Sequence, residues 1–155
     1  MLYEVTNNTG RDVEFYPSLR LVTDTLKVVE GGADISPSVY DAIAARHKHE
    51  FPFLAPPTKV TGLLLQGEEN ARASVGVFRM FDKEASGFTI YVGGFSGDVR
   101  RIANPAFDTK RKKSADNQRF FFLRRTLAIR YDLPGAPDTR WRATPIRKTR
   151  EWVMR

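Results

Sequence analysis

Short segments in which apolar and polar residues alternate recur along almost the whole chain. The first runs from Tyr3 to Thr6, and the longest runs from Phe120 to Leu133. Side chains of a β-strand point alternately to its two faces, so a period of two is typical of strands with one buried face. Such segments follow one another at spacings of roughly 8–14 residues, separated by turns rich in glycine, proline and asparagine. The pattern predicts a mainly β fold of about eight strands.

Short turns between successive strands favour an antiparallel, immunoglobulin-like sandwich of two sheets, with a partly closed barrel as the alternative. The length of 155 residues suits one domain, so residues 1–155 are interpreted as a single sandwich domain. Its apolar residues, 41 % of the chain, include 11 Phe, 5 Tyr and 2 Trp, which is enough material for a core. Residues 59–66 and 72–81 are expected to form a hairpin about a turn at Gly67–Asn70.

One segment, near residues 36–49, predicts a short α-helix instead. Ser36 can accept a hydrogen bond from the first turn, and Pro37 falls at the first helical position, where a missing N–H costs nothing. Val39 and Ile43 form the expected buried stripe. Basic residues gather towards the end of the segment, as the helix dipole prefers.

Charge is distributed unevenly along the chain. Residues 1–97 hold nine Lys/Arg against twelve Asp/Glu, whereas residues 98–155 hold sixteen against six. A strongly basic half attracts nucleic acid, anionic lipid or acidic polysaccharide. The simpler interpretation, that these charges are the solvated faces of strands, stays open.

A basic loop at residues 108–119 is the strongest candidate for polyanion binding. It interrupts an expected strand pair, residues 99–103 and residues 120–133. The candidate residues in the region 108–130 are Lys110, Arg111, Lys112, Lys113, Arg119, Arg124 and Arg130. Three successive phenylalanines, 120–122, follow the loop, and exposed rings could stack on unpaired bases. Core packing is nevertheless expected for most of them, and also for Trp141 and Trp152.

No catalytic, cofactor or metal site is predicted. The chain has no cysteine, which excludes disulfides, thiolate metal sites and cysteine nucleophiles. His47 and His49 are two positions apart and would point apart on a helix, so we interpret them as cations at a helix end. Ser96 has neither the spacing of a nucleophile elbow nor a partnered base. We therefore expect a protein that is not an enzyme.

Residues 63–68, 75–78 and 88–92 together resemble a pattern found in bacterial envelope domains of the immunoglobulin-like, telokin-like type. In that pattern an apolar strand reaches a "pGe" turn, and a "gvavF" strand and a "f.lyv.gl" strand follow. The matching span covers 30 of the 155 residues. The resemblance implies a two-sheet sandwich outside the cytoplasm that acts as a binding or structural module. The expected helix and the basic loop depart from the family pattern.

Two functional hypotheses follow. The first is a non-enzymatic module of the bacterial cell envelope that contacts a protein or a cell-wall component. The second is a module that binds nucleic acid or another polyanion through residues 108–130. We expect an extracytoplasmic location, periplasmic or secreted with the leader removed, and otherwise a cytoplasmic one. No run approaches the roughly 20 apolar residues of a transmembrane segment, and an exposed sheet edge could pair two copies as a homodimer.

Overall fold

The computed structural model describes residues 1–79, 82–112 and 114–155, and within them the fold is mainly β, as the alternation predicts. The strands are β1 Leu2–Asn7, β2 Val13–Phe15, β3 Ser18–Thr23, β4 Val28–Glu30, β5 Gly62–Leu64, β6 Gly67–Val75, β7 Gly87–Gly93, β8 Val99–Ala103, β9 Phe120–Asp132 and β10 Ile146–Met154. The helices are α1 Pro37–Arg46 and three single turns of 3-10 helix, η1 Pro57–Lys59, η2 Ala115–Asn117 and η3 Arg140–Arg142. These ten strands of the described residues exceed the expected eight, and three of them, β2, β4 and β5, are only three residues long.

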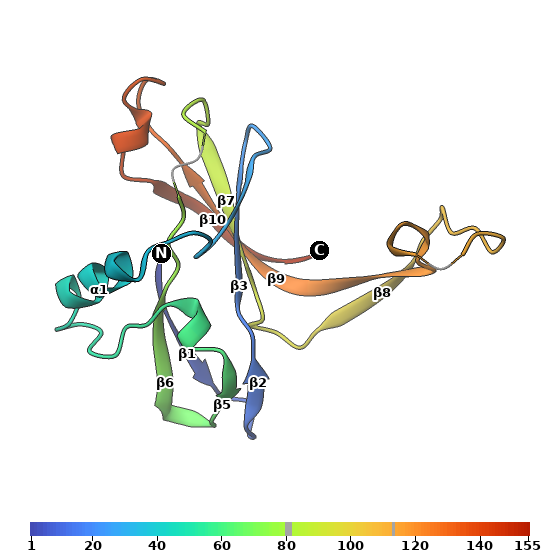
Figure 1. Cartoon of the computed structure of the whole chain (residues 1–155), viewed down its shortest axis with the longest axis horizontal. Coiled ribbons are helices and arrows are strands. Elements are labelled where there is room, and N and C mark those ends of the chain that lie inside the picture. The colour runs from blue at the N-terminus through green and yellow to red at the C-terminus, as the bar shows by residue number, and fades with distance from the viewer. Residues whose placement is uncertain (80–81, 113) are drawn as a thin grey trace.

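The main sheet has the strand order β10-β9-β7-β3-β4, with every neighbouring pair antiparallel (Figure 1). One face of this sheet, here called the inner face, carries the larger buried cluster. Its members are Leu19, Leu21, Phe88, Ile90, Val92 and Leu127. They occupy every second position of β3, β7 and β9, because alternate side chains of a strand share a face. The other face of the sheet is called the outer face below.

Two small antiparallel sheets, β1-β6 and β2-β5, form a second layer below the main sheet in Figure 1. Between them lies a second buried cluster of Val5, Phe15, Val60 and Leu64. Phe95 packs against both clusters. The sheets end in free edges and do not close, so the arrangement is that of an antiparallel sandwich and the barrel alternative is wrong.

The expected hairpin of residues 59–81 is wrong in its pairing. β5 pairs with β2, and β6 pairs with β1. β6 also begins at Gly67 itself, where a φ of 108° turns the chain, and it ends at Val75. Residues 80 and 81, the end of the expected second strand, lie outside the described residues.

The helix is confirmed, but its details differ from the expectation. α1 ends at Arg46, and none of its residues is buried. Val39, expected in a buried stripe, is 40 % exposed. The hydroxyl of Ser36 makes no capping bond and lies 2.9 Å from the hydroxyl of Ser38 instead. The helix is therefore a surface element. All the helices in the described part of the chain are too short or too polar to cross a lipid bilayer.

The expected strand pair around the basic loop is confirmed, and it projects from the sandwich as an arm. Among the described strands β8 pairs with β9 alone, from Val99 opposite Arg124 to Ala103 opposite Phe120. Beyond Arg125 the same strand β9 runs between β10 and β7 in the main sheet. The base of the arm is closed by Asp98, whose carboxylate lies 2.9 Å from the guanidinium of Arg125. We call residues 98–125 the arm and the remainder of the chain the body.

Candidate functional site

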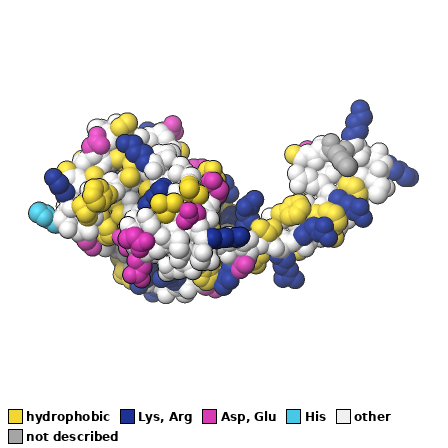
Figure 2. All heavy atoms as spheres, turned by 90° about the horizontal axis from the view of Figure 1, so that it is seen from below, with side chains coloured by type: hydrophobic (Ala, Val, Ile, Leu, Met, Phe, Trp, Pro, Cys, Tyr) yellow, Lys and Arg dark blue, Asp and Glu magenta, His cyan; other side chains and the backbone are white. Residues whose placement is uncertain are grey.

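The arm is a two-stranded ribbon that extends away from the body (Figures 1 and 2). Its ladder of five residue pairs spans roughly 15 Å at the usual rise of a strand. A loop of residues 104–119, here called the tip loop, joins the two strands. Figure 2 shows Lys and Arg side chains along its length and around its tip, with hydrophobic side chains between them.

One buried amide organises the tip loop. Asn117 is only 1 % exposed, and its Nδ2 donates to the carbonyls of Asp108, Arg111 and Lys112 at 2.9, 3.2 and 3.3 Å. Its Oδ1 accepts the N–H of Asp108 at 2.9 Å. A buried amide with several backbone partners fixes the path of the chain around it. The basic side chains of residues 110–112 are therefore exposed on a backbone that is already held in place.

On one face of the arm, aromatic rings alternate with guanidinium groups. Arg101 lies opposite Phe122 in the ladder, and its guanidinium is 4.4 Å from the ring centroid of Phe120. The guanidinium of Arg119 lies 5.3 Å from the same centroid. Phe122 is 63 % exposed. This face offers flat groups for stacking beside cations, the combination used by proteins that bind single-stranded nucleic acid.

The expectation of core packing for the phenylalanines is wrong. Phe121 on the opposite face of the arm is 43 % exposed, as is Trp152 in β10. The reason lies in the neighbouring strands. β7 ends its pairing opposite Leu127, before the arm begins, and neither buried cluster of the described residues extends onto the arm. Trp152 lies in β10, the edge strand of the main sheet. The side chain of Trp141 lies outside the described part of the structure.

Almost the entire net charge of the protein resides on the arm. Its 28 residues contain nine Lys/Arg and three Asp/Glu, a balance of +6 out of the chain total of +7. The other 127 residues contain sixteen against fifteen, a balance of +1. One of the three acids, Asp98, is paired with Arg125. A field concentrated on a projecting element attracts polyanions to that element first.

The structure brings most of the sequence-predicted residues together on the arm. Lys110, Arg111 and Lys112 are exposed at the tip, Arg119 lies just before β9, and Arg124 lies near the base. Arg130 lies apart from them, on the outer face of the main sheet. Lys113 lies outside the described residues.

The prediction missed the cations of the other strand. Arg100 and Arg101 lie on β8, opposite Leu123 and Phe122. The strand pair was itself predicted, so the alternation of β8 could have revealed that these arginines accompany β9.

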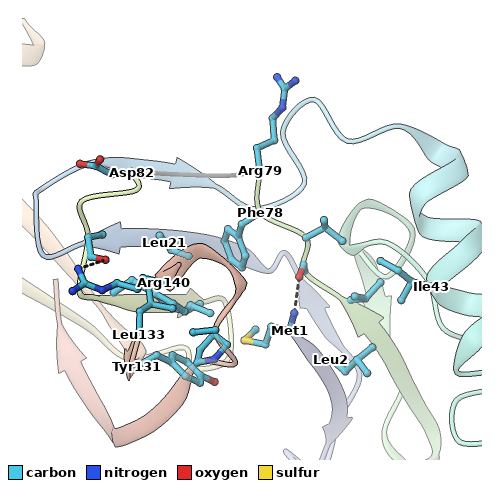
Figure 3. Close-up of a pocket in the computed structure, with 18 of the residues that line it drawn as sticks. Met1, Leu2, Leu21, Ile43, Phe78, Arg79, Asp82, Tyr131, Leu133 and Arg140 are labelled. Atoms are coloured by element: carbon cyan, nitrogen blue, oxygen red, sulfur yellow. Dashed lines mark hydrogen bonds between the residues drawn. The ribbon is translucent and has the colours of Figure 1, made fainter. Parts of the chain in front are cut away.

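A cavity of about 690 Å³ in the body is a second candidate (Figure 3). The inner face of the main sheet and the side chain of Ile43 on α1 form part of its mainly apolar wall, and Arg140 lies at its edge. The guanidinium of Arg140 donates to the carbonyls of Gly135, Glu84 and Ala85 at 3.2 to 3.3 Å. The guanidinium of Arg140 is therefore already bound by the body, whereas the described cations of the tip loop are exposed, and the arm is the better candidate for binding an anion.

The arm thus combines a fixed loop, clustered cations and exposed rings. Comparisons of the chain with models of protein families, with curated proteins and with solved structures found no match.

Proposed function

We propose that the protein binds nucleic acid through the arm, as a binding module without catalytic activity. The observation that carries the proposal is the placement of +6 of the net charge on a projecting 28-residue hairpin. Neutralising phosphates releases condensed counterions, and this release provides most of the affinity of non-specific nucleic-acid binding. Such binding needs clustered cations and no deep pocket.

Exposed rings on the arm favour nucleic acid over lipid or polysaccharide as the ligand. Phe122 shares a face with Arg101, and its ring is mostly exposed. A base stacked on an aromatic side chain contributes about 1–3 kcal/mol, whichever base it is, because every base has a flat π face. Bases within a duplex are already stacked on one another, so the rings favour a single strand over a duplex. A two-stranded ribbon also fits the major groove of duplex DNA, which makes duplex the necessary comparison.

The salt dependence of binding follows from the number of phosphates contacted. Each phosphate neutralised on a single strand lowers the slope of log K against log salt by about 0.7. If four to six cations of the arm contact phosphates, the slope is about −3 to −4. A slope near zero would mean that the arm makes no ionic contact with the ligand.

The test is fluorescence anisotropy with a labelled single strand, a duplex and an acidic polysaccharide, each at low and near-physiological salt. Replacement of Lys110, Arg111, Lys112 and Lys113 by Ser should weaken single-strand binding about 10- to 100-fold and make the salt slope shallower by 2 to 3, an estimate from four lost phosphate contacts. The matched control replaces four exposed cations of the body by Ser. These are Arg11, Arg46, Lys48 and Lys59.

Both variants lose four positive charges, so they differ only in the part of the molecule from which the charges are removed. A large loss confined to the tip-loop variant supports the arm as the binding surface. Equal losses in the two variants would mean that net charge alone governs binding, and the proposal would be overturned. Preference for the acidic polysaccharide would also overturn it, and would favour the cell-envelope module that the sequence resemblance implies.

A further inference from the structure

We infer that a bound single strand continues from the arm onto the outer face of the main sheet, where its phosphates meet a second contact surface. This surface, here called the sheet-face site, consists of Tyr91, Arg124, Arg130 and Arg155. The inference rests on the proposed function and extends it from the arm to the body. It assigns a role to Arg130, which lies away from the other predicted cations.

Continuity between the two surfaces comes from strand β9. It is unbroken over 13 residues, a length of about 40 Å, and it belongs to both the arm and the main sheet. Alternate side chains of a strand share a face. Phe122 and Arg124 of the arm therefore lie on the same face of β9 as Ala128 and Arg130 of the body. A ligand that follows this face passes from one part to the other without crossing a strand edge.

The outer face is hollowed where β9 enters the main sheet. Two adjoining depressions, of about 620 and 420 Å³, share Tyr91 and Arg155 in their walls. Small side chains form their floor, since Ala128 lies opposite Tyr91 and Thr126 is two positions away along β9. Small floor residues between long rim residues leave a shallow polar groove, which suits a sugar–phosphate backbone better than an apolar molecule.

Arg155 is held beside the arm in an orientation that suits phosphate binding. Its backbone N–H and C=O pair with those of Arg124 at 3.2 and 2.8 Å. Its guanidinium lies 3.8 Å from the ring centroid of Tyr91. A guanidinium stacked on a ring keeps its in-plane N–H donors available for a planar or tetrahedral anion.

The charge balance of this face is positive. Among the ion pairs of the described residues, none involves Arg124, Arg130 or Arg155. Arg20, at the far wall of one depression, is paired with Glu30 at 2.7 Å. One further carboxylate, that of Glu151, lines the other depression. Among the described side chains that line the two depressions, three arginines without an ion-pair partner therefore accompany one unpaired side-chain carboxylate.

The test uses the double variant Arg130→Ser and Arg155→Ser with oligothymidylates of about 6 and about 18 nucleotides. These lengths lie near the lower end and just above the upper end of the range of site sizes, about 4–16 nucleotides, of single-strand binding folds. We expect affinity for the long strand to fall about 5- to 20-fold, with the salt slope shallower by about 1.4 for two lost phosphate contacts. Affinity for the short strand, which the arm alone can hold, should not change. The matched control, Arg46→Ser at the end of α1 with Lys48→Ser in the turn that follows, removes the same charge and should leave the binding of both lengths unaffected.

The outcomes separate this inference from the proposed function. If the double variant binds the long strand as tightly as the unmodified protein, the sheet-face site is overturned, while the tip-loop variant still tests the arm. Equal losses for both lengths would also overturn it, because one surface would then hold the whole ligand. Thermal unfolding monitored by circular dichroism checks that the variants are folded. Arg130→Lys keeps the positive charge that Arg130→Ser removes. An ionic contact therefore predicts that Arg130→Lys has the salt slope of the unmodified protein.

Discussion

Asn117 and Asp108 hold each other through two reciprocal hydrogen bonds of 2.9 Å, one from the Asp108 N–H to Asn117 Oδ1 and one from Asn117 Nδ2 to the Asp108 carbonyl. These bonds close the tip loop upon itself. The side-chain carboxylate of Asp108 in turn accepts the N–H of Lys110 at 2.9 Å. The cations that follow are thus ordered before any ligand arrives, and ordering a loop on binding would otherwise lower the affinity.

Replacing Asn117 by Ala should weaken binding without changing its ionic character. The variant keeps every cation, so the salt slope should stay the same, while loss of the fixed loop should lower affinity about 3- to 10-fold. Anisotropy titrations at several salt concentrations measure both quantities. Asn8→Ala, at an exposed asparagine of the body, is the control. A shallower salt slope would contradict the prediction, because it would mean that fewer cations of the tip loop contact phosphates in the variant.

Replacing Phe122 by Ala should lower affinity for a single strand and leave folding unaffected. Because the ring is 63 % exposed, its loss opens no cavity, and the free energy of unfolding should change by less than about 0.5 kcal/mol. Loss of one stacked base should cost about 5- to 150-fold in single-strand affinity, the equivalent of about 1–3 kcal/mol. Phe53→Ala removes an 87 % exposed ring from the body and serves as the control. An equal loss of duplex affinity would contradict stacking as the cause.

The body should fold without the arm. Neither buried cluster contains a residue of the arm, so its contacts do not contribute to the core. Replacing residues 101–122 by Asn-Gly joins Arg100 to Leu123, which are opposite in the ladder, through a two-residue hairpin turn. We expect thermal unfolding close to that of the full chain and loss of nucleic-acid binding. A chain that failed to fold would show that the arm is part of the folding unit.

Phe95 joins the two layers of the sandwich, and its replacement by Ala should destabilise both. Its ring lies edge-on to Tyr3 and Phe15, with centroids 5.7 and 5.2 Å apart. Gly94, with a φ of 89°, turns the chain to place it, and a Cβ there would lie 2.5 Å from the Tyr16 carbonyl oxygen. We expect a loss of about 2–4 kcal/mol in urea unfolding, lower than for a fully buried ring. If Phe95→Ala unfolded in two separate transitions in urea, Phe95 would also couple the unfolding of the two layers.

What the sequence predicted well depends on neighbouring residues. The alternation of residues 120–133 predicted a strand with one buried face, because the side-chain period of a strand is local. Leu127 and Ile129 of β9 do lie on the inner face. Proline and the turn residues placed α1 for the same reason. The pairing of β8 with β9 followed because only one loop separates the two strands.

What the sequence did not predict depends on distant segments. Whether Phe121 is buried is decided by where β7 and β10 stop, and these strands are encoded far away in the chain. The same holds for β6, whose partner β1 is about 70 residues away, for example Leu2 opposite Val75. The sheet-face site was missed because Tyr91 and Arg155 meet only through the strand order of the main sheet.

The hydroxyl of Tyr3 gives a prediction for alkaline pH. Its oxygen is buried and has no hydrogen-bond partner in the described part of the chain, and the hydroxyl of Ser74, on the opposing residue, donates its proton to the Ala55 carbonyl. Burial raises the pKa of Tyr3 above its ordinary value of 10.0. The folded state therefore favours the neutral phenol. The stability that the neutral Tyr3 phenol contributes is fully present below pH 10 and is lost as the pH rises through the folded-state pKa.

Tyr3→Phe should remove this loss. Near neutral pH the free energy of unfolding should change by less than about 1 kcal/mol or increase, because an unsatisfied buried hydroxyl is removed. Above pH 10 the variant should become progressively more stable than the unmodified protein. Urea unfolding near neutral pH and above pH 10 measures the difference. Parallel stability curves for Tyr3→Phe and the unmodified protein would mean that the hydroxyl is solvated in the folded state.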